Sequence, residues 1–171
     1  AAIETPEGPQ RVRGLAGSGK TIVLALKAAY LHAQHPAWNI AVTFNTLSLS
    51  QQFTDLIERF SIEHSGDKPN WEKLQVIHAW GSYSSQGVYS KIAAAINFIP
   101  MDYASASQKY GRNKAFDGIC TETLVAIKNS PVEIFDAILI DEAQDLPVPF
   151  FQLIYEVTAP PKRIIWAYDE L

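Results

Sequence analysis

The stretch RVRGLAGSGKT, residues 11–21, decides the fold of this chain. The apolar, β-branched run at 11–15 is typical of a strand, and the Leu- and Ala-rich run after Thr21 is typical of a helix. Between them, Gly14, Gly19, Lys20 and Thr21 match the pattern G-x-x-x-x-G-K-[ST] without departure. The stretch therefore predicts a strand, a glycine-rich turn and a helix, the context in which this pattern binds phosphate.

The residue types of this turn suit a bound anion. Glycines allow successive backbone N–H groups to point at phosphate oxygens, and the helix N-terminus adds partial positive charge. We expect Lys20 to reach the β and γ phosphates and the Thr21 hydroxyl to bind Mg²⁺. The alternative is a strand-to-helix turn of purely structural use. The residues expected to bind the nucleotide are Gly14, Ala16, Gly17, Ser18, Gly19, Lys20 and Thr21.

Strand and helix patterns alternate along the rest of the chain. Further strands are expected at 39–44, 73–80, 136–141 and 162–169, and helices at 21–34 and 49–60. This alternation predicts an α/β domain with a central, mainly parallel sheet flanked by helices. Residues 81–135 contain helical patterns but no clear strand, and we expect them to form an inserted helical subdomain.

Composition fits one folded domain of 171 residues, with 47% apolar and 19% charged residues. The single Cys120 excludes an internal disulfide and a multi-cysteine metal site. The polar residues 1–10 resemble neither a signal peptide nor a membrane span. These features predict a cytoplasmic protein without a membrane partner.

The stretch AILIDEAQD, residues 137–145, supplies acidic groups at the end of a predicted buried strand. Ligands bind beyond the carboxyl ends of strands in open α/β sheets, so Asp141 is expected to hold Mg²⁺. Glu142 is placed to accept a proton from an attacking water, which favours hydrolysis over binding alone. The alternatives are a solvated turn for both carboxylates and a helix N-cap for Asp145.

Three stretches together resemble a known family. GLAGSGKT (14–21), ILIDEAQD (138–145) and IIWAYDE (164–170) closely resemble motifs I, II and III of UvrD/Rep-like superfamily 1 helicases. The resemblance implies a RecA-like P-loop domain that hydrolyses ATP with Mg²⁺ and is coupled to movement on single-stranded DNA, with RNA left open. It implies that Lys20, Asp141 and Glu142 act in catalysis, and that Gln144 senses the γ-phosphate.

The resemblance also implies contacts to nucleic acid. TFNTLSLSQQF (43–53) resembles motif Ia, and VIHAWGS (76–82) resembles the motif that follows it. The expected contact residues are Phe44, Asn45, His78 and Trp80, whose aromatic rings would stack on bases. The alternatives are that Phe44 belongs to the core, that His78 is a hydrogen-bonded core histidine, and that Trp80 packs under the insert.

Charge bears on how strongly nucleic acid would bind. Lys and Arg total 14 against 18 acidic residues, a formal charge of −4, which argues against strong duplex binding. The basic loop KYGRNK (109–114) either binds backbone phosphates or is simply a solvated loop. We therefore expect weak binding of strands by this chain alone.

The chain is expected to be part of a longer helicase. The family's adenine-reading glutamine is not found upstream of the P-loop, and motif III stops at Leu171, one residue before its expected glutamine. A second motor domain carrying arginine fingers would follow, so the chain alone should hydrolyse ATP slowly. The rival functions are an ATP-gated switch that binds nucleic acid or protein without unwinding, and a P-loop kinase.

Overall fold

The structure, a computed structural model, describes residues 7–170. Every strand expected from the sequence is present, although β3 ends at His78 and is shorter than expected. In chain order the elements are β1 (Gln10–Gly14), α1 (Lys20–Gln34), β2 (Ile40–Phe44), α2 (Leu49–Ser65), β3 (Leu74–His78), α3 (Val88–Ala95), α4 (Tyr103–Tyr110), the 3₁₀ turn η1 (Arg112–Lys114), α5 (Ala115–Asn129), β4 (Phe135–Ile140), the 3₁₀ turn η2 (Ala143–Asp145), α6 (Val148–Val157) and β5 (Thr158–Asp169).

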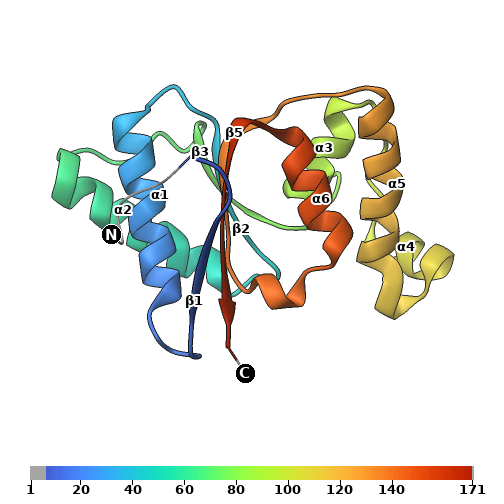
Figure 1. Cartoon of the computed structure of the whole chain (residues 1–171), viewed down its shortest axis with the longest axis horizontal. Coiled ribbons are helices and arrows are strands. Elements are labelled where there is room, and N and C mark those ends of the chain that lie inside the picture. Colours follow the sequence, from blue (N-terminus) through green and yellow to red (C-terminus); the bar gives the residue numbers. More distant parts are fainter. Residues whose placement is uncertain (1–6, 171) are drawn as a thin grey trace.

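The strands form one sheet in the order β1-β5-β4-β2-β3. Every neighbouring pair is parallel, so the predicted α/β class and parallel sheet are confirmed. Because all strands run the same way, their carboxyl ends lie at one edge of the sheet, which is the lower edge in Figure 1. The segments that follow the strands therefore meet at that edge.

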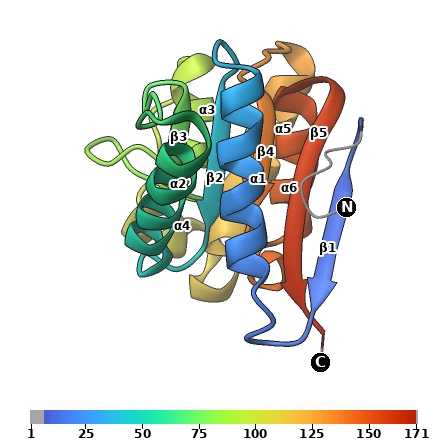
Figure 2. The ribbon, with the colours of Figure 1, turned by 90° about the vertical axis from the view of Figure 1, so that its left-hand side faces the viewer.

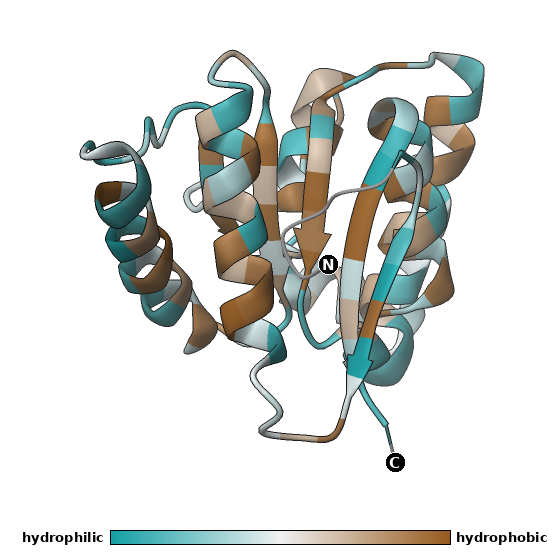
Figure 3. Ribbon diagram, turned by 60° about the vertical axis from the view of Figure 1, so that its left-hand side comes forward, coloured by the Kyte–Doolittle hydropathy of each residue, from teal (hydrophilic) through white to brown (hydrophobic). Residues whose placement is uncertain are grey.

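Helices cover both faces of the sheet. In Figure 1, α1 and α2 lie on one side and α3, α5 and α6 on the other. On β2, Ile40 and Val42 pack into the core under α1 and α2, whereas Ala41 packs into the opposite core. Because the sheet is buried on both faces, its strands have continuous apolar sequences. Figure 3 shows these apolar runs along the central strands.

The strand-free segment 81–135 contributes α3, α4, η1 and α5, and its last residue begins β4. Ile92 of α3 and Ile119 of α5 are buried in the same core as Ile138 of β4. The segment therefore supplies part of the second helical layer, and only α4 and η1 extend from it (Figure 1). It is helical, as expected, but α3 and α5 share the core of the sheet and do not form a separate one.

The interpretation of Asp145 as a helix N-cap is wrong. Asp145 lies in η2, and the next helix, α6, begins only at Val148 after Pro147. Pro147 takes the N-cap position of α6, so Asp145 does not cap this helix.

Candidate nucleotide-binding site

The glycine-rich turn and the acidic strand end lie at the carboxyl edge of the sheet. The turn joins β1 to α1, and Figure 2 shows it beside the end of β5. Gly14 of β1 pairs in register with Asp169 of β5, and Asp141 follows β4, the next strand in the sheet. Strand order thus brings the beginning of the sequence close to residues near its end.

The turn has a backbone conformation that requires glycine. Gly17 has φ of 75° and Gly19 has φ of 84°, both in the left-handed region. The Ser18 N–H donates to the Leu15 carbonyl at 3.0 Å, which closes the turn before α1 begins at Lys20. The N-terminus of α1 therefore faces the site, where its partial positive charge favours an anion.

Lys20 is 8% exposed, and its ammonium group is surrounded by protein oxygens. It donates to the carbonyls of Gly14 at 3.0 Å and Leu15 at 2.7 Å. It is also 3.3 Å from Oγ of Ser18 and 2.6 Å from Oδ1 of Asp169. The ammonium is therefore held at the centre of the turn, with one carboxylate beside it.

Thr21 joins the turn to the acidic strand end. Its hydroxyl donates to Oδ2 of Asp141 at 2.6 Å, and the Glu142 N–H donates to Oδ1 of the same carboxylate at 2.9 Å. Asp141 is only 3% exposed, so these bonds fix both of its oxygens. Hydroxyl and carboxylate oxygens are ligands that Mg²⁺ prefers, so Thr21 and Asp141 fit this ion.

No group of three or more His, Cys, Asp or Glu side chains within residues 7–170 is arranged to hold a metal by itself. Magnesium commonly binds through one or two protein oxygens together with water and substrate phosphates. The pair of Thr21 and Asp141 suits that mode of binding.

Glu142 adopts an uncommon backbone conformation, with φ of 51° and ψ of 45°. This region costs a non-glycine residue on the order of 1 kcal/mol or more, and such residues cluster at functional sites. Its Oε2 accepts a hydrogen bond from the Thr46 hydroxyl at 3.0 Å. The carboxylate is thus held in place by the segment that follows β2.

A cavity of about 310 Å³ lies between these groups. The sequence predicted seven of its lining residues, but it did not predict Ile22, Gln52 or Asp169. Asp169 lies within the quoted motif III stretch, and a carboxylate as the last residue of a predicted strand was the signal available for it. The lining residues are Gly17, Ser18, Gly19, Lys20, Thr21, Ile22, Gln52, Asp141, Glu142 and Asp169.

Three residues that the sequence predicted for this site do not line the cavity. Gly14 ends β1 and contributes its carbonyl to Lys20. Ala16 is exposed and does not line the cavity. Gln144 does not line it either, and its Oε1 accepts a hydrogen bond from the Asp169 N–H at 3.3 Å.

The prediction that Phe44 contacts nucleic acid is wrong for this structure. Phe44 has no exposed surface, and its ring stacks on Phe53 of α2 with centroids 5.9 Å apart. The last residue of β2 points into the core between the sheet and α2, so it offers no face to a base.

His78 is a hydrogen-bonded bridge at the ends of two strands. The Trp80 N–H donates to its Nδ1 at 3.1 Å, so Nε2 carries the proton and donates to the Asn45 carbonyl at 2.6 Å. With both ring nitrogens engaged, His78 joins the end of β3 to the segment after β2. The hydrogen bonds agree with the alternative for His78, but the residue is only partly buried and does not belong to the core.

Trp80 packs under the helical segment. Its ring stacks on Phe116 with centroids 5.1 Å apart, and its indole N–H donates to the Met101 carbonyl at 2.9 Å. It remains partly exposed, and together with Asn45 and Gln144 it lines a polar cavity of about 430 Å³. Arg112 and Lys114 of the basic loop line the same cavity.

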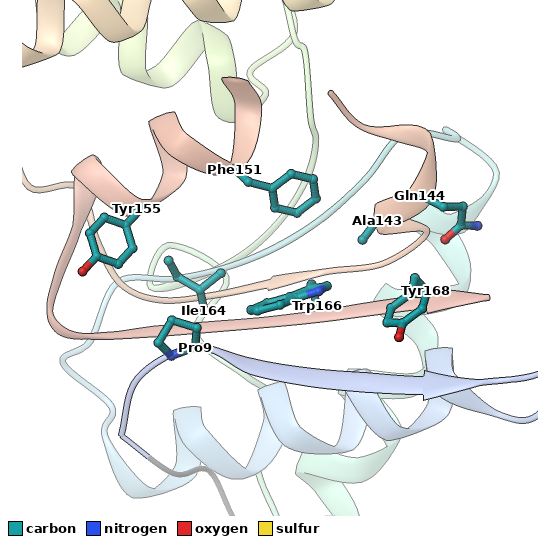
Figure 4. Close-up of a pocket in the computed structure, with 8 residues that line it drawn as sticks. All are labelled: Pro9, Ala143, Gln144, Phe151, Tyr155, Ile164, Trp166 and Tyr168. Carbon is teal, nitrogen blue, oxygen red and sulfur yellow. The ribbon is translucent and has the colours of Figure 1, made fainter. Parts of the chain in front are cut away.

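An apolar cavity of about 400 Å³ lies between α6 and β5 (Figure 4). The rings of Phe151, Trp166 and Tyr168 surround it, and none of its lining residues is charged. None of these lining residues is a cation, whereas Lys20 lines the smaller cavity at the turn.

No protein-family model matches this chain, and a search of curated proteins also finds no match. Within residues 7–170, no helix combines the length and the apolar character that crossing a membrane requires.

Proposed function

We propose that this chain is a RecA-like ATP-binding motor domain that hydrolyses Mg·ATP, as its resemblance to UvrD/Rep-like helicases implies. The observation that supports this most is the 2.6 Å hydrogen bond from Thr21 to Asp141. It joins the two halves of a phosphate and magnesium site that lie far apart in the sequence.

The glycine-rich turn and four side chains of the cavity have roles in this proposal. The turn and the N-terminus of α1 bind the phosphates through backbone N–H groups, and Lys20 pairs with the β and γ phosphates. Thr21 and Asp141 hold Mg²⁺, which when bound neutralises and orients the phosphate oxygens. Glu142, held by Thr46, accepts a proton from the water that attacks the γ-phosphate.

Hydrolysis is favoured over transfer to another molecule. Glu142 lines the same cavity as Lys20 and Thr21, so water bound there has a base within the site. A kinase needs a bound acceptor in place of that water. The rival function, an ATP-gated switch, would use the same nucleotide site. A measurement of ATP turnover distinguishes such a switch from a motor.

Single-stranded DNA, or RNA, is the proposed partner at the polar cavity of about 430 Å³. Arg112 and Lys114 supply positive charge for backbone phosphates, and Trp80 supplies a partly exposed aromatic ring. Gln144 lines this cavity and also contacts Asp169 of the nucleotide cavity. It is therefore the residue through which we propose that the two cavities communicate.

Calorimetric titration with Mg·ATP tests the nucleotide site. Lys20→Ala should weaken binding by about tenfold to a hundredfold, because a hydrogen bond to a charged group contributes about 1.5–3 kcal/mol. The exposed Lys128 on α5, on the opposite face of the sheet from α1, provides the control Lys128→Ala. Equal affinity of both variants and the parent, or no binding by the parent, would contradict the proposal.

Phosphate release tests the reaction, and fluorescence anisotropy of a labelled single strand tests the partner. A motor should release phosphate faster when single-stranded DNA is added, whereas a kinase should label an acceptor and a switch should show no stimulation. Arg112→Ala should weaken strand binding more than Lys128→Ala does, because Arg112 lines the polar cavity.

A further inference from the structure

The ammonium group of Lys20 has no free hydrogen to offer a phosphate. An ammonium has three N–H donors. Four protein oxygens lie around it, from Gly14, Leu15, Ser18 and Asp169, at distances between 2.6 and 3.3 Å. A phosphate that pairs with Lys20 must therefore displace one of these oxygens.

The Asp169 carboxylate is the group that a phosphate would displace. The distance from its Oδ1 to the Lys20 nitrogen, 2.6 Å, is the shortest of the four, and the Asp169 side chain is 40% exposed. The carbonyls of Gly14 and Leu15 are parts of the turn itself, whereas the carboxylate can leave by rotation of a side chain. A second negative charge beside the incoming phosphate would also repel it.

The backbone of Asp169 is held by hydrogen bonds that do not involve its carboxylate. Its N–H donates to Gln144, and the Glu170 N–H donates to the Gly14 carbonyl at 3.1 Å. Asp169 also pairs with Gly14 in the register of β1 and β5. Displacement of the carboxylate therefore requires no change in the sheet.

From this geometry we infer that Asp169 is an internal competitor of the nucleotide, occupying the place on Lys20 that the β and γ phosphates take. This inference rests on the proposed nucleotide site. Asp169 acts through Lys20 and is a positioning residue. In the empty site it keeps the buried ammonium paired, and it lowers the affinity for nucleotides by the free energy of that pair.

Asp169→Asn tests this inference against a matched control. The neighbouring Glu170 pairs with Arg13 at 3.4 Å and is 42% exposed, close to the 40% of Asp169. Asp169→Asn and Glu170→Gln thus each remove one negative charge from the same strand end. Only Asp169→Asn removes the negative charge that pairs with Lys20.

Calorimetric titration should show that Asp169→Asn binds Mg·ATP and Mg·ADP about twofold to fivefold more tightly than Glu170→Gln, as expected for a partly exposed ion pair. Affinity for AMP should not differ between the two, because its single phosphate does not reach Lys20. A merely structural role for Asp169 would not distinguish ADP from AMP.

Two results would count against the inference in different ways. If the parent protein binds Mg·ATP but Asp169→Asn binds it no more tightly than Glu170→Gln, the inference is overturned and the nucleotide site stands. If neither the parent nor either variant binds Mg·ATP, the proposed function fails as well. Asp169→Ser removes the same charge with a shorter side chain and should reproduce the tighter binding.

Discussion

The Thr21 hydroxyl donates a 2.6 Å hydrogen bond to Asp141, although 120 positions separate the two residues in the chain. Asp141 is almost fully buried, so its charge is stabilised by hydrogen bonds and not by water. Thr21 belongs to the first turn of α1, and Asp141 directly follows β4. Their contact joins the start of the helix to the end of the strand, beside the cavity that both residues line.

Thr21→Val keeps the branched shape of the side chain but removes its hydroxyl. We expect the Mg²⁺-dependent gain in ATP affinity to fall by about tenfold, because one oxygen ligand is lost. Binding of ATP without Mg²⁺ should change little, because Lys20 and the backbone of the turn remain. Titrations with and without Mg²⁺ measure both quantities.

Thr54→Val is a suitable control for that substitution. Thr54 also donates its hydroxyl to a nearby oxygen, the carbonyl of Ser50, but it lies on α2 outside the nucleotide cavity. An equal loss of Mg²⁺-dependent affinity in both variants would refute the assignment of Thr21 as a ligand.

Glu142→Gln should stop ATP hydrolysis and leave binding of Mg·ATP nearly unchanged. The amide keeps the size of the side chain and can still accept the hydrogen bond from Thr46, but it cannot take a proton from water. General-base catalysis contributes about 10²- to 10⁴-fold, which sets the expected drop in phosphate release.

The exposed Asp145, in the turn just after Glu142, provides the control Asp145→Asn. It removes a charge nearby without touching the nucleotide cavity, and turnover is compared without nucleic acid because Asp145 lines the polar cavity. Turnover by Glu142→Gln at the rate of the Asp145→Asn variant would place the base elsewhere.

Local patterns in the sequence predicted the turn, the acidic strand end and every strand. These features depend on neighbouring residues, such as the glycines before Lys20 and the apolar run before Asp141. The hydrogen bond from Thr46 to Glu142 and the ion pair between Lys20 and Asp169 depend on the strand order β1-β5-β4-β2-β3. No local pattern specifies that order, so these partners could not be predicted.

Phe44 illustrates the same limit at the nucleic-acid contacts. An aromatic residue at a strand end can stack on a base or pack in the core. Phe44 packs in the core because Phe53 of α2 covers it. Sequence position alone does not place that helix. Similarly, the packing of Trp80 depends on Phe116 of α5 and on Met101, both distant in the sequence.

Phe44→Ala should lower the free energy of unfolding by about 3–5 kcal/mol, because it leaves a cavity in a fully buried core. Urea denaturation followed by circular dichroism measures this quantity. The exposed Leu47, three positions along the chain and 71% exposed, provides the control, and Leu47→Ala should change stability by less than about 0.5 kcal/mol. Similar stability of the two variants would show that Phe44 is not part of the core.

His32 should make the stability of the fold depend on pH. It is 8% exposed, and burial lowers its pKa from the ordinary value of 6.5. Its Nε2 accepts a hydrogen bond from the Asn70 N–H at 3.1 Å, so protonation of that nitrogen would break the bond. The folded chain therefore keeps His32 neutral at a pH where the unfolded chain protonates it.

The sign of the effect follows from this difference in proton binding. Below 6.5, the unfolded chain binds more protons at His32 than the folded chain does, so the stabilising contribution is present above that value and is lost as the pH falls toward the lowered pKa. The loss from this one group is at most about 1.4 kcal/mol per pH unit. Urea denaturation at about pH 7.5 and about pH 5.5 should therefore show a smaller loss of stability for His32→Gln than for the parent protein.

The exposed His64 on α2 provides the control, because His64→Gln leaves the buried imidazole in place and should retain the pH dependence of the parent. Carboxylates that titrate in the same range contribute equally to all three proteins, so an identical loss in His32→Gln and in the parent would mean that His32 does not contribute to the pH dependence.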